Sequence, residues 1–131
     1  MLKGSGTWER IHGWATTSRA ETRAAASRLD ERARLACERA DFAEAASLVA
    51  QAISLLEARG VFAPDGVELA NERAKLGRLQ FNAAPAGGAP GGEARCMLTR
   101  AAEALSLLHG SDDDEVCELR GLAAMCNPAA P

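Results

Sequence analysis

The sequence has few aromatic residues and no long apolar run. Tyrosine is absent, and Phe and Trp together contribute only five of the 131 residues. Aromatic and β-branched residues favour strands, so their scarcity argues against a β-sheet protein. No apolar run reaches the roughly 18 residues of a candidate transmembrane helix, and the N-terminus lacks the apolar core of a signal peptide. We therefore expect no membrane partner and a cytoplasmic or nuclear location.

The sequence also lacks clustered metal ligands. Its four cysteines are widely spaced, at Cys37, Cys96, Cys117 and Cys126. None forms a CxxC pair, and the two histidines, His12 and His109, lie far apart. A structural zinc site needs about four ligands, usually in short-spaced pairs. We therefore expect free thiols, no metal and no cofactor.

The net charge of -3 is unevenly distributed. Residues 1–40 carry a balance of +3, whereas residues 41–131 carry -6. A net negative charge gives no overall attraction for nucleic acid or anionic membranes, so no nucleic-acid partner is expected. A basic N-terminal arm that touches nucleic acid remains the alternative. We expect instead that the arginines of this region pair with glutamates on the same helix.

Alanine is abundant, with 29 residues. It is the strongest helix former, because it loses no side-chain entropy in the helix, and it lets helices approach closely. Apolar residues recur at spacings of three and four, as on one face of a helix, in five segments. These predicted helices cover approximately 17–39, 42–59, 67–82, 93–109 and 114–127.

The chain is expected to form one helical domain with short irregular ends. The predicted parts are an irregular N-terminal arm at 1–17, a helical domain at 18–127 and a tail at 128–131. The arm is predicted because Gly4, Gly6 and Gly13 interrupt any helical pattern. Residues 83–92, AAPAGGAPGG, predict a flexible loop within the domain.

Two of these helices have the spacing of a tetratricopeptide unit, a helix–turn–helix of about 34 residues. Its second helix opens with an aromatic residue and places alanines three and ten residues later, with a bulky residue between them. Here these positions hold Phe42, Ala45, Val49 and Ala52. Ala33, twelve residues before Ala45, takes the small position where the two helices cross.

A second unit is visible further along the chain. Gly77 fits its crossing position, and Ala94, Leu98 and Ala101 repeat the spacing of the first unit. Facing helices approach closely only where their side chains are small. The prediction is an all-α fold, a tetratricopeptide-like, right-handed stack of about five helices in tandem antiparallel pairs. An unrelated antiparallel bundle is the alternative.

The second half of the sequence resembles the C-terminal helical domain of SET-and-MYND lysine methyltransferases, over roughly residues 30–126. In that family a "KLG-L" helix precedes a helix ending in "L-HG". The matching residues are Lys75, Leu76, Gly77, Leu79, Leu107, His109 and Gly110. Kinesin light chains use a similar "HG" turn. The SET core and the zinc-binding cysteines are absent here, so the resemblance implies the tail of such a protein without its enzyme.

The predicted stack would present a concave groove on its first helices. The register places six residues near it: Asp30, Arg34, Asn71, Ala74, Arg78 and Glu118. Arg34, Asn71 and Arg78 are the candidate partner-binding residues. The two arginines are candidates to receive a carboxylate through forked hydrogen bonds, with solvated arginines as the alternative. Asp30 and Ala74 stand where a chaperone-tail clamp would need cationic or polar residues, so a full clamp is not expected.

The remaining polar motifs favour structural roles. His109 has no evident nucleophile partner and ends a predicted helix, where a cation is favourable. The acidic run 112–115 lacks the alternating spacing of a calcium loop and is expected to cap a helix. No catalytic residues are predicted. We expect a non-catalytic protein–protein interaction module for a peptide or a neighbouring domain. The alternatives are a detached regulatory region of a SET-and-MYND-type methyltransferase and, less favoured, a small hydrolase-like enzyme using His109.

Overall fold

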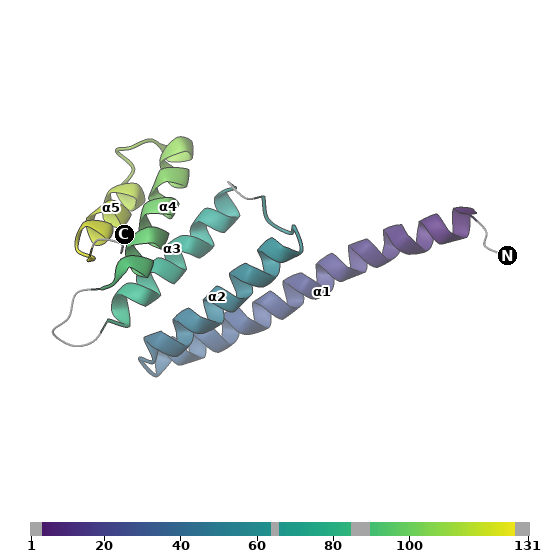
Figure 1. Ribbon diagram of the computed structural model, residues 1–131, viewed down its shortest axis with the longest axis horizontal. Helices are drawn as coiled ribbons and strands as arrows, with labels where there is room; N and C mark the ends of the chain where they lie inside the picture. Colours follow the sequence, from purple (N-terminus) through teal and green to yellow (C-terminus); the bar gives the residue numbers. More distant parts are fainter. Residues whose placement is uncertain (1–3, 64–65, 85–89, 128–131) are drawn as a thin grey trace.

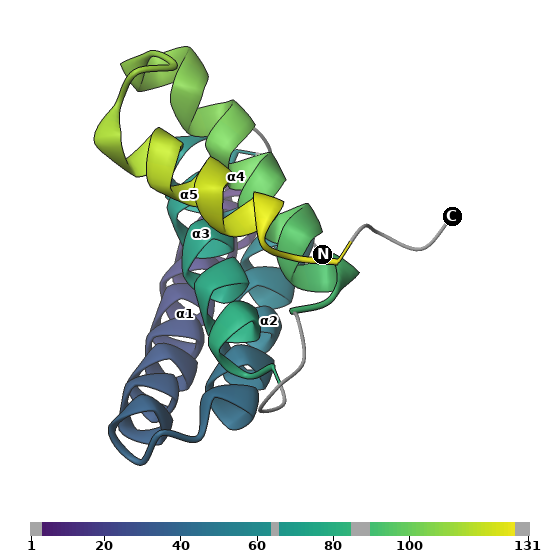
Figure 2. The same ribbon diagram turned by 90° about the vertical axis from the view of Figure 1, so that its left-hand side faces the viewer.

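The computed structural model describes residues 4–63, 66–84 and 90–127, and within these ranges it contains helices and no strand. The five helices are α1 (Gly4–Glu38), α2 (Phe42–Ala58), α3 (Val67–Asn82), α4 (Gly92–His109) and α5 (Asp114–Ala124). Each packs against the next along the chain, and successive helices run antiparallel (Figure 1). Figure 2 looks along the stack, with α5 nearest the viewer. The predicted all-α stack of about five helices is confirmed.

The expectation of an irregular arm at 1–17 is wrong for the described residues. Helix α1 begins at Gly4 and continues without interruption to Glu38. A glycine inside a helix costs only about 1 kcal/mol relative to alanine, and Glu9, Arg10 and Ala15 favour the helix. Scattered glycines therefore weaken a helix without ending it. Figure 1 shows that the first part of α1 extends beyond the end of α2.

None of the described helices is both long enough and apolar enough to cross a bilayer. The predicted loop at 83–92 is described only at its two ends, since 85–89 lie outside the described residues. The predicted tail at 128–131 also lies outside them. The backbone N–H of Asn127 donates to the carbonyl of Pro90 at 2.7 Å, which ties the end of the described chain to the start of α4.

Aspartates cap the starts of α2 and α5. The Asp41 carboxylate accepts a hydrogen bond from the backbone N–H of Glu44 at 3.2 Å. The Asp113 carboxylate accepts from the N–H groups of Glu115 and Val116, at 3.1 and 3.2 Å. These bonds satisfy helix N–H groups that have no partner within the helix. The predicted capping role of the acidic run is confirmed at Asp113.

The ends of α1 and α2 share one hydrogen-bonding pattern. At the end of α1 the N–H of Ala40 donates to Cys37 and the N–H of Asp41 donates to Ala36, both at 2.9 Å. This pair of hydrogen bonds is the Schellman motif, which needs a residue in the left-handed backbone conformation directly after the helix. Gly60 takes that position after α2 with φ 64°, whereas Ala40 takes it after α1 with φ 58°. The turn between α1 and α2 therefore places an alanine where glycine is favoured.

The predicted small contact positions are all buried. They are Ala33, Ala45, Ala52, Gly77, Ala94 and Ala101. The contact at Gly77 is especially close: a Cβ placed there would lie 2.8 Å from Cγ and 3.1 Å from the backbone N of Leu98 on α4. Real Cβ atoms do not approach carbon so closely, so α3 and α4 cross at this separation only because residue 77 is glycine.

The core divides between the two sides of α3. Leu69, Leu76 and Leu79 pack with α1 and α2, whereas Ala70 and Ala74 pack with α4 and α5. The largest fully buried side chains come from four of the helices: Leu69, Leu98, Leu105, Leu119, Val49 and Val116. Because α3 contributes to both clusters, it fixes the first pair of helices relative to the last.

Candidate functional site

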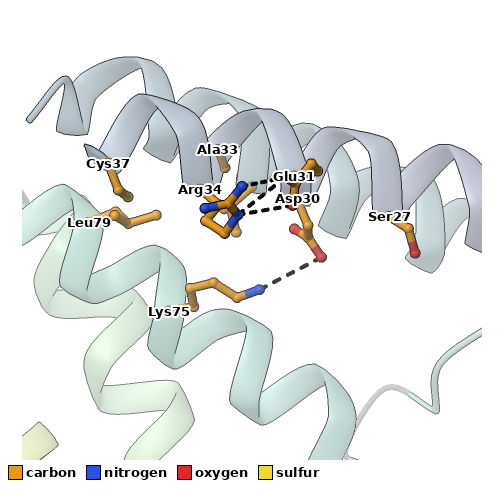
Figure 3. Close-up of a pocket in the computed structure, with 9 residues that line it drawn as sticks. Ser27, Asp30, Glu31, Ala33, Arg34, Cys37, Lys75 and Leu79 are labelled. Carbon is orange, nitrogen blue, oxygen red and sulfur yellow. Dashed lines mark hydrogen bonds and ion pairs between the residues drawn. The ribbon is translucent and has the colours of Figure 1, made fainter. Parts of the chain in front are cut away.

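A hollow of about 490 Å³ lies between α1 and α3, with α2 beneath it. The polar side chains include Asp30, Glu31 and Arg34 on α1 and Lys75 on α3, and the apolar ones include Val49 on α2 and Leu79 on α3. We call this hollow the α1–α3 groove. Figure 3 shows the α1 side chains along one wall and Lys75 and Leu79 on the other.

The helical repeat explains why these residues line one surface. Ser27, Asp30, Arg34 and Cys37 recur at spacings of three and four along α1, so they share one face. Ala33, between them, is buried where α1 meets α2. The apolar edge of the helix is thus held by packing, and the adjacent polar edge forms the wall of the groove.

Arg34 is already paired with two glutamates of its own helix. Its Nε and Nη2 donate to the two carboxylate oxygens of Glu31 at 3.0 and 2.6 Å, and Nη1 donates to Glu38 at 2.5 Å. The hydrogen bond from Arg34 lowers the pKa of the Glu31 carboxyl. The same bond, together with the charges of both glutamates, raises the pKa of Arg34. The expectation that these arginines pair with glutamates on the same helix is confirmed for Arg34.

Lys75 links the two walls of the groove. Its Nζ lies 3.7 Å from Asp30 Oδ2 on α1 and 3.2 Å from Glu72 Oε1 on its own helix. The second oxygens of both carboxylates, Asp30 Oδ1 and Glu72 Oε2, are buried and accept no hydrogen bond from any part of the chain that the structure describes. One ammonium group therefore serves two carboxylates, each of which retains an oxygen without a donor.

Arg78 occupies a second hollow, of about 230 Å³, between α3 and α5. Its Nη2 lies 3.0 Å from Glu118 Oε1 and 3.9 Å from Glu115 Oε2. Phe81 and Leu122 supply the apolar part of the lining. The two hollows lie on either side of α3, and cross-helix ion pairs from Lys75 and Arg78 join α1, α3 and α5 along this surface.

The predicted groove residues have different positions in the structure. Arg34 lines the α1–α3 groove and Arg78 lines the hollow beside α5. Asn71 is exposed on α3 and lines neither hollow. The expectation for Ala74 is wrong, because it is buried in the core shared with α4 and α5. As an alanine next to the crossing at Gly77, it belongs to the contact face of α3.

Sequence reasoning did not place Lys75, Glu31 or Glu72 in the groove. The spacing of Glu72 and Lys75, three residues apart on a predicted helix, was the available signal for one ion pair. The contact from Lys75 to Asp30 depends on how α1 and α3 are packed. No spacing of residues along the sequence specifies the distance between these two helices.

The other motifs remain outside the groove. His109 is exposed at the last position of α4, and Gly110 follows it with φ 91°. In the described ranges no three His, Cys, Asp or Glu side chains lie close enough to hold a metal ion. All four cysteines are free thiols; Cys126 is buried, and this burial raises the pKa of its thiol.

Among the described residues, the α1–α3 groove is the larger of these two hollows, and both combine apolar with charged side chains. Comparison with known proteins adds no further assignment: no protein-family model matches the chain, and no significant match was found among curated proteins or solved structures.

Proposed function

We propose that this chain is a non-catalytic protein–protein interaction module that holds a peptide, or a segment of a neighbouring domain, against α1, α3 and α5. The observation that carries this proposal is the α1–α3 groove, with charged walls and an apolar floor. Binding clefts commonly combine an apolar lining with a few polar groups that fix the orientation of the ligand. The ion pairs of Lys75 and Arg78 extend the same charged surface to α5.

A tetratricopeptide-like, right-handed stack is the arrangement we favour for this surface. In such stacks the first helix of each pair lines the inner face, and the second helix lies behind it. Residues of α1, α3 and α5 form most of the lining of the two hollows. Gly77 on α3 lies at a close contact with α4, and Ala45 on α2 is buried in the cluster that α2 shares with α1. Extended peptides and partner helices are both recognised by grooves of this kind.

A selection experiment tests the proposal. A random dodecapeptide library is panned against the full chain, and the affinity of the selected peptides is measured by fluorescence anisotropy. Ser27→Trp adds a large side chain at the edge of the groove, where Ser27 is exposed. Ser54→Trp makes the same change at an exposed position of α2, away from the groove.

The expected result is that Ser27→Trp weakens binding at least tenfold, whereas Ser54→Trp leaves the affinity unchanged. Circular dichroism checks that both variants keep the helical content of the parent chain. Failure to select any peptide, or equal effects of the two substitutions, would contradict a docking role for this groove.

A second candidate function is the detached regulatory C-terminal region of a SET-and-MYND-type lysine methyltransferase. Its support is that Gly77, in the "KLG-L" segment, lies at a close crossing of α3 and α4, and that Gly110 of the "HG" pair ends α4 with a positive φ. The genomic sequence upstream of Met1 distinguishes the two candidates. A SET core in the same reading frame supports the second, and its absence there argues against it.

A further inference from the structure

We infer that the partner segment is basic: the charged face formed by α1, α3 and α5 takes a peptide in which Lys or Arg side chains flank an apolar residue. This inference rests on the proposed function and specifies its ligand. It departs from the expectation that Arg34 and Arg78 receive a carboxylate of the partner.

The first argument is the balance of charge within the ion-pair clusters of this face. It carries three cations that each contact two carboxylates: Arg34 with Glu31 and Glu38, Lys75 with Asp30 and Glu72, and Arg78 with Glu115 and Glu118. Within these three ion-pair clusters, three cations among six carboxylates leave an excess of three negative charges. The further pair between Arg23 and Glu68, at 4.0 Å, is balanced and does not change this excess.

The second argument is that the forked edge of Arg34 is already occupied, with three of its five N–H donors used. The Nε, Nη1 and Nη2 atoms of Arg34 each donate to Glu31 or Glu38. A carboxylate approaching the remaining N–H groups of Arg34 would lie next to Glu31 and Glu38. Like charges at contact distance repel, and the forked contact to Glu31 is the strongest geometry that an incoming carboxylate could reproduce. An acidic ligand therefore gains little at this position.

The third argument is that the same glutamates are accessible to a cation. The side chains of Glu31 and Glu38 are 58% and 60% exposed, and that of Glu118 is 61% exposed, so their free lone pairs face solvent. Behind them, the buried Asp30 Oδ1 and Glu72 Oε2 have no hydrogen-bond donor in the described ranges and add negative potential to the hollow. A cleft with low-dielectric walls concentrates such a field.

The fourth argument concerns the apolar residue of the ligand. Between the charged walls the floor is apolar: Val49 is fully buried, and Ala33 and Leu79 are 4% and 8% exposed. An apolar side chain of the ligand lies against this floor without leaving a polar group unpaired, while neighbouring cations reach Glu31 on the wall and Glu38 two turns further along α1. The groove thus favours the combination of charge and apolar contact over a polybasic segment alone.

The dodecapeptide selection tests this inference through the composition of the selected peptides. They are expected to be enriched in Lys and Arg next to an apolar residue and depleted in Asp and Glu. For synthetic copies of these peptides, Glu31→Gln combined with Glu38→Gln should weaken binding to the full chain by about fivefold to tenfold at low salt, since each exposed charge pair contributes modestly. Raising the salt concentration should remove most of this difference.

The matched control is Glu44→Gln combined with Glu103→Gln, which makes the same change of net charge. Both glutamates are exposed, on α2 and α4, and neither forms an ion pair with a residue that the structure describes. This control should leave the affinity within about twofold of the parent chain, because screened charges on other helices act weakly at a distance.

The outcomes separate this inference from the proposed function. If the selected peptides are acidic or neutral and their binding is abolished by Ser27→Trp, the inference of a basic ligand is wrong and the proposed docking groove is still supported. Stronger binding after the Glu31 and Glu38 substitutions would overturn it as well. If the chain forms a salt-sensitive dimer that Glu31→Gln combined with Glu38→Gln abolishes, the groove holds a second copy of the chain. This result would contradict a basic segment of another protein as the ligand.

Discussion

Replacing Gly77 with alanine tests the close crossing of α3 and α4. The added Cβ would lie 2.8 and 2.9 Å from Cγ and Cδ2 of Leu98, and 3.1 Å from its backbone N. Leu98 is fully buried, so its side chain has no open space to move into, and its backbone N moves only with the helix. Overpacking of this kind costs about 1–3 kcal/mol. The cost should fall at the upper end here, because a backbone atom is involved.

The substitution also gains helix propensity, which opposes this cost. Alanine favours a helix over glycine by about 1 kcal/mol. The net expectation for Gly77→Ala is a loss of about 1–2 kcal/mol in the free energy of unfolding. For a chain of this length that loss corresponds to a fall of roughly 4–8 °C in Tm. Urea and thermal unfolding followed by circular dichroism measure both quantities.

Gly121→Ala is the matched control in α5. No atom lies within 4 Å of the Cβ position of Gly121, which is exposed, so the substitution gains helix propensity without a clash. It should stabilise the chain by about 0.5–1 kcal/mol. If Gly77→Ala stabilises the chain as Gly121→Ala does, the close contact between α3 and α4 is refuted. A double-mutant cycle with Leu98→Ala should give a favourable coupling, because the shorter side chain relieves the clash.

Three further outcomes follow from the helix ends and the groove. Asp113→Ala should cost about 1 kcal/mol in urea unfolding, because two α5 N–H groups lose their acceptor, whereas Asp112→Ala, beside the cap, should cost much less. Ala40→Gly should stabilise the chain by about 0.5–1 kcal/mol, because glycine adopts the left-handed conformation without strain. NMR titration should find the pKa of Glu31 below its ordinary value, and Arg34→Gln should restore it. Because the folded pKa is the lower one, this contact stabilises the fold above the unfolded pKa and is lost as the pH falls through the folded value.

The helices from α2 onward could be predicted closely because their ends are set by local chemistry. Asp41 and Asp113 provide caps, and Gly60 and Gly110 adopt the positive φ that ends α2 and α4. The start of α1 could not be predicted by the same logic. Its glycines lower the helix propensity, but the segment contains no proline. Proline would remove a hydrogen bond and clash with the preceding turn, and so end the helix.

The packing positions were also predictable, whereas the ion pairs between helices were not. Small residues at repeated spacings, such as Ala45 and Gly77, mark where helices meet, because only small side chains permit the approach. The pairing of Lys75 with Asp30 depends on the rotation and separation of α1 and α3, which no short motif specifies. The acidic character of the groove emerged only when those contacts were known.

The most direct test of the docking face is an NMR map of amide chemical shifts, recorded while the isotope-labelled full chain is titrated with the tightest selected peptide. If the ligand lies in the α1–α3 groove, the largest shifts will come from residues near Asp30, Arg34 and Lys75, and the exposed face of α4 around Glu103 will be unaffected. Largest shifts on α2 and α4, or no localised shifts at saturation, would contradict the assignment of this groove as the binding surface.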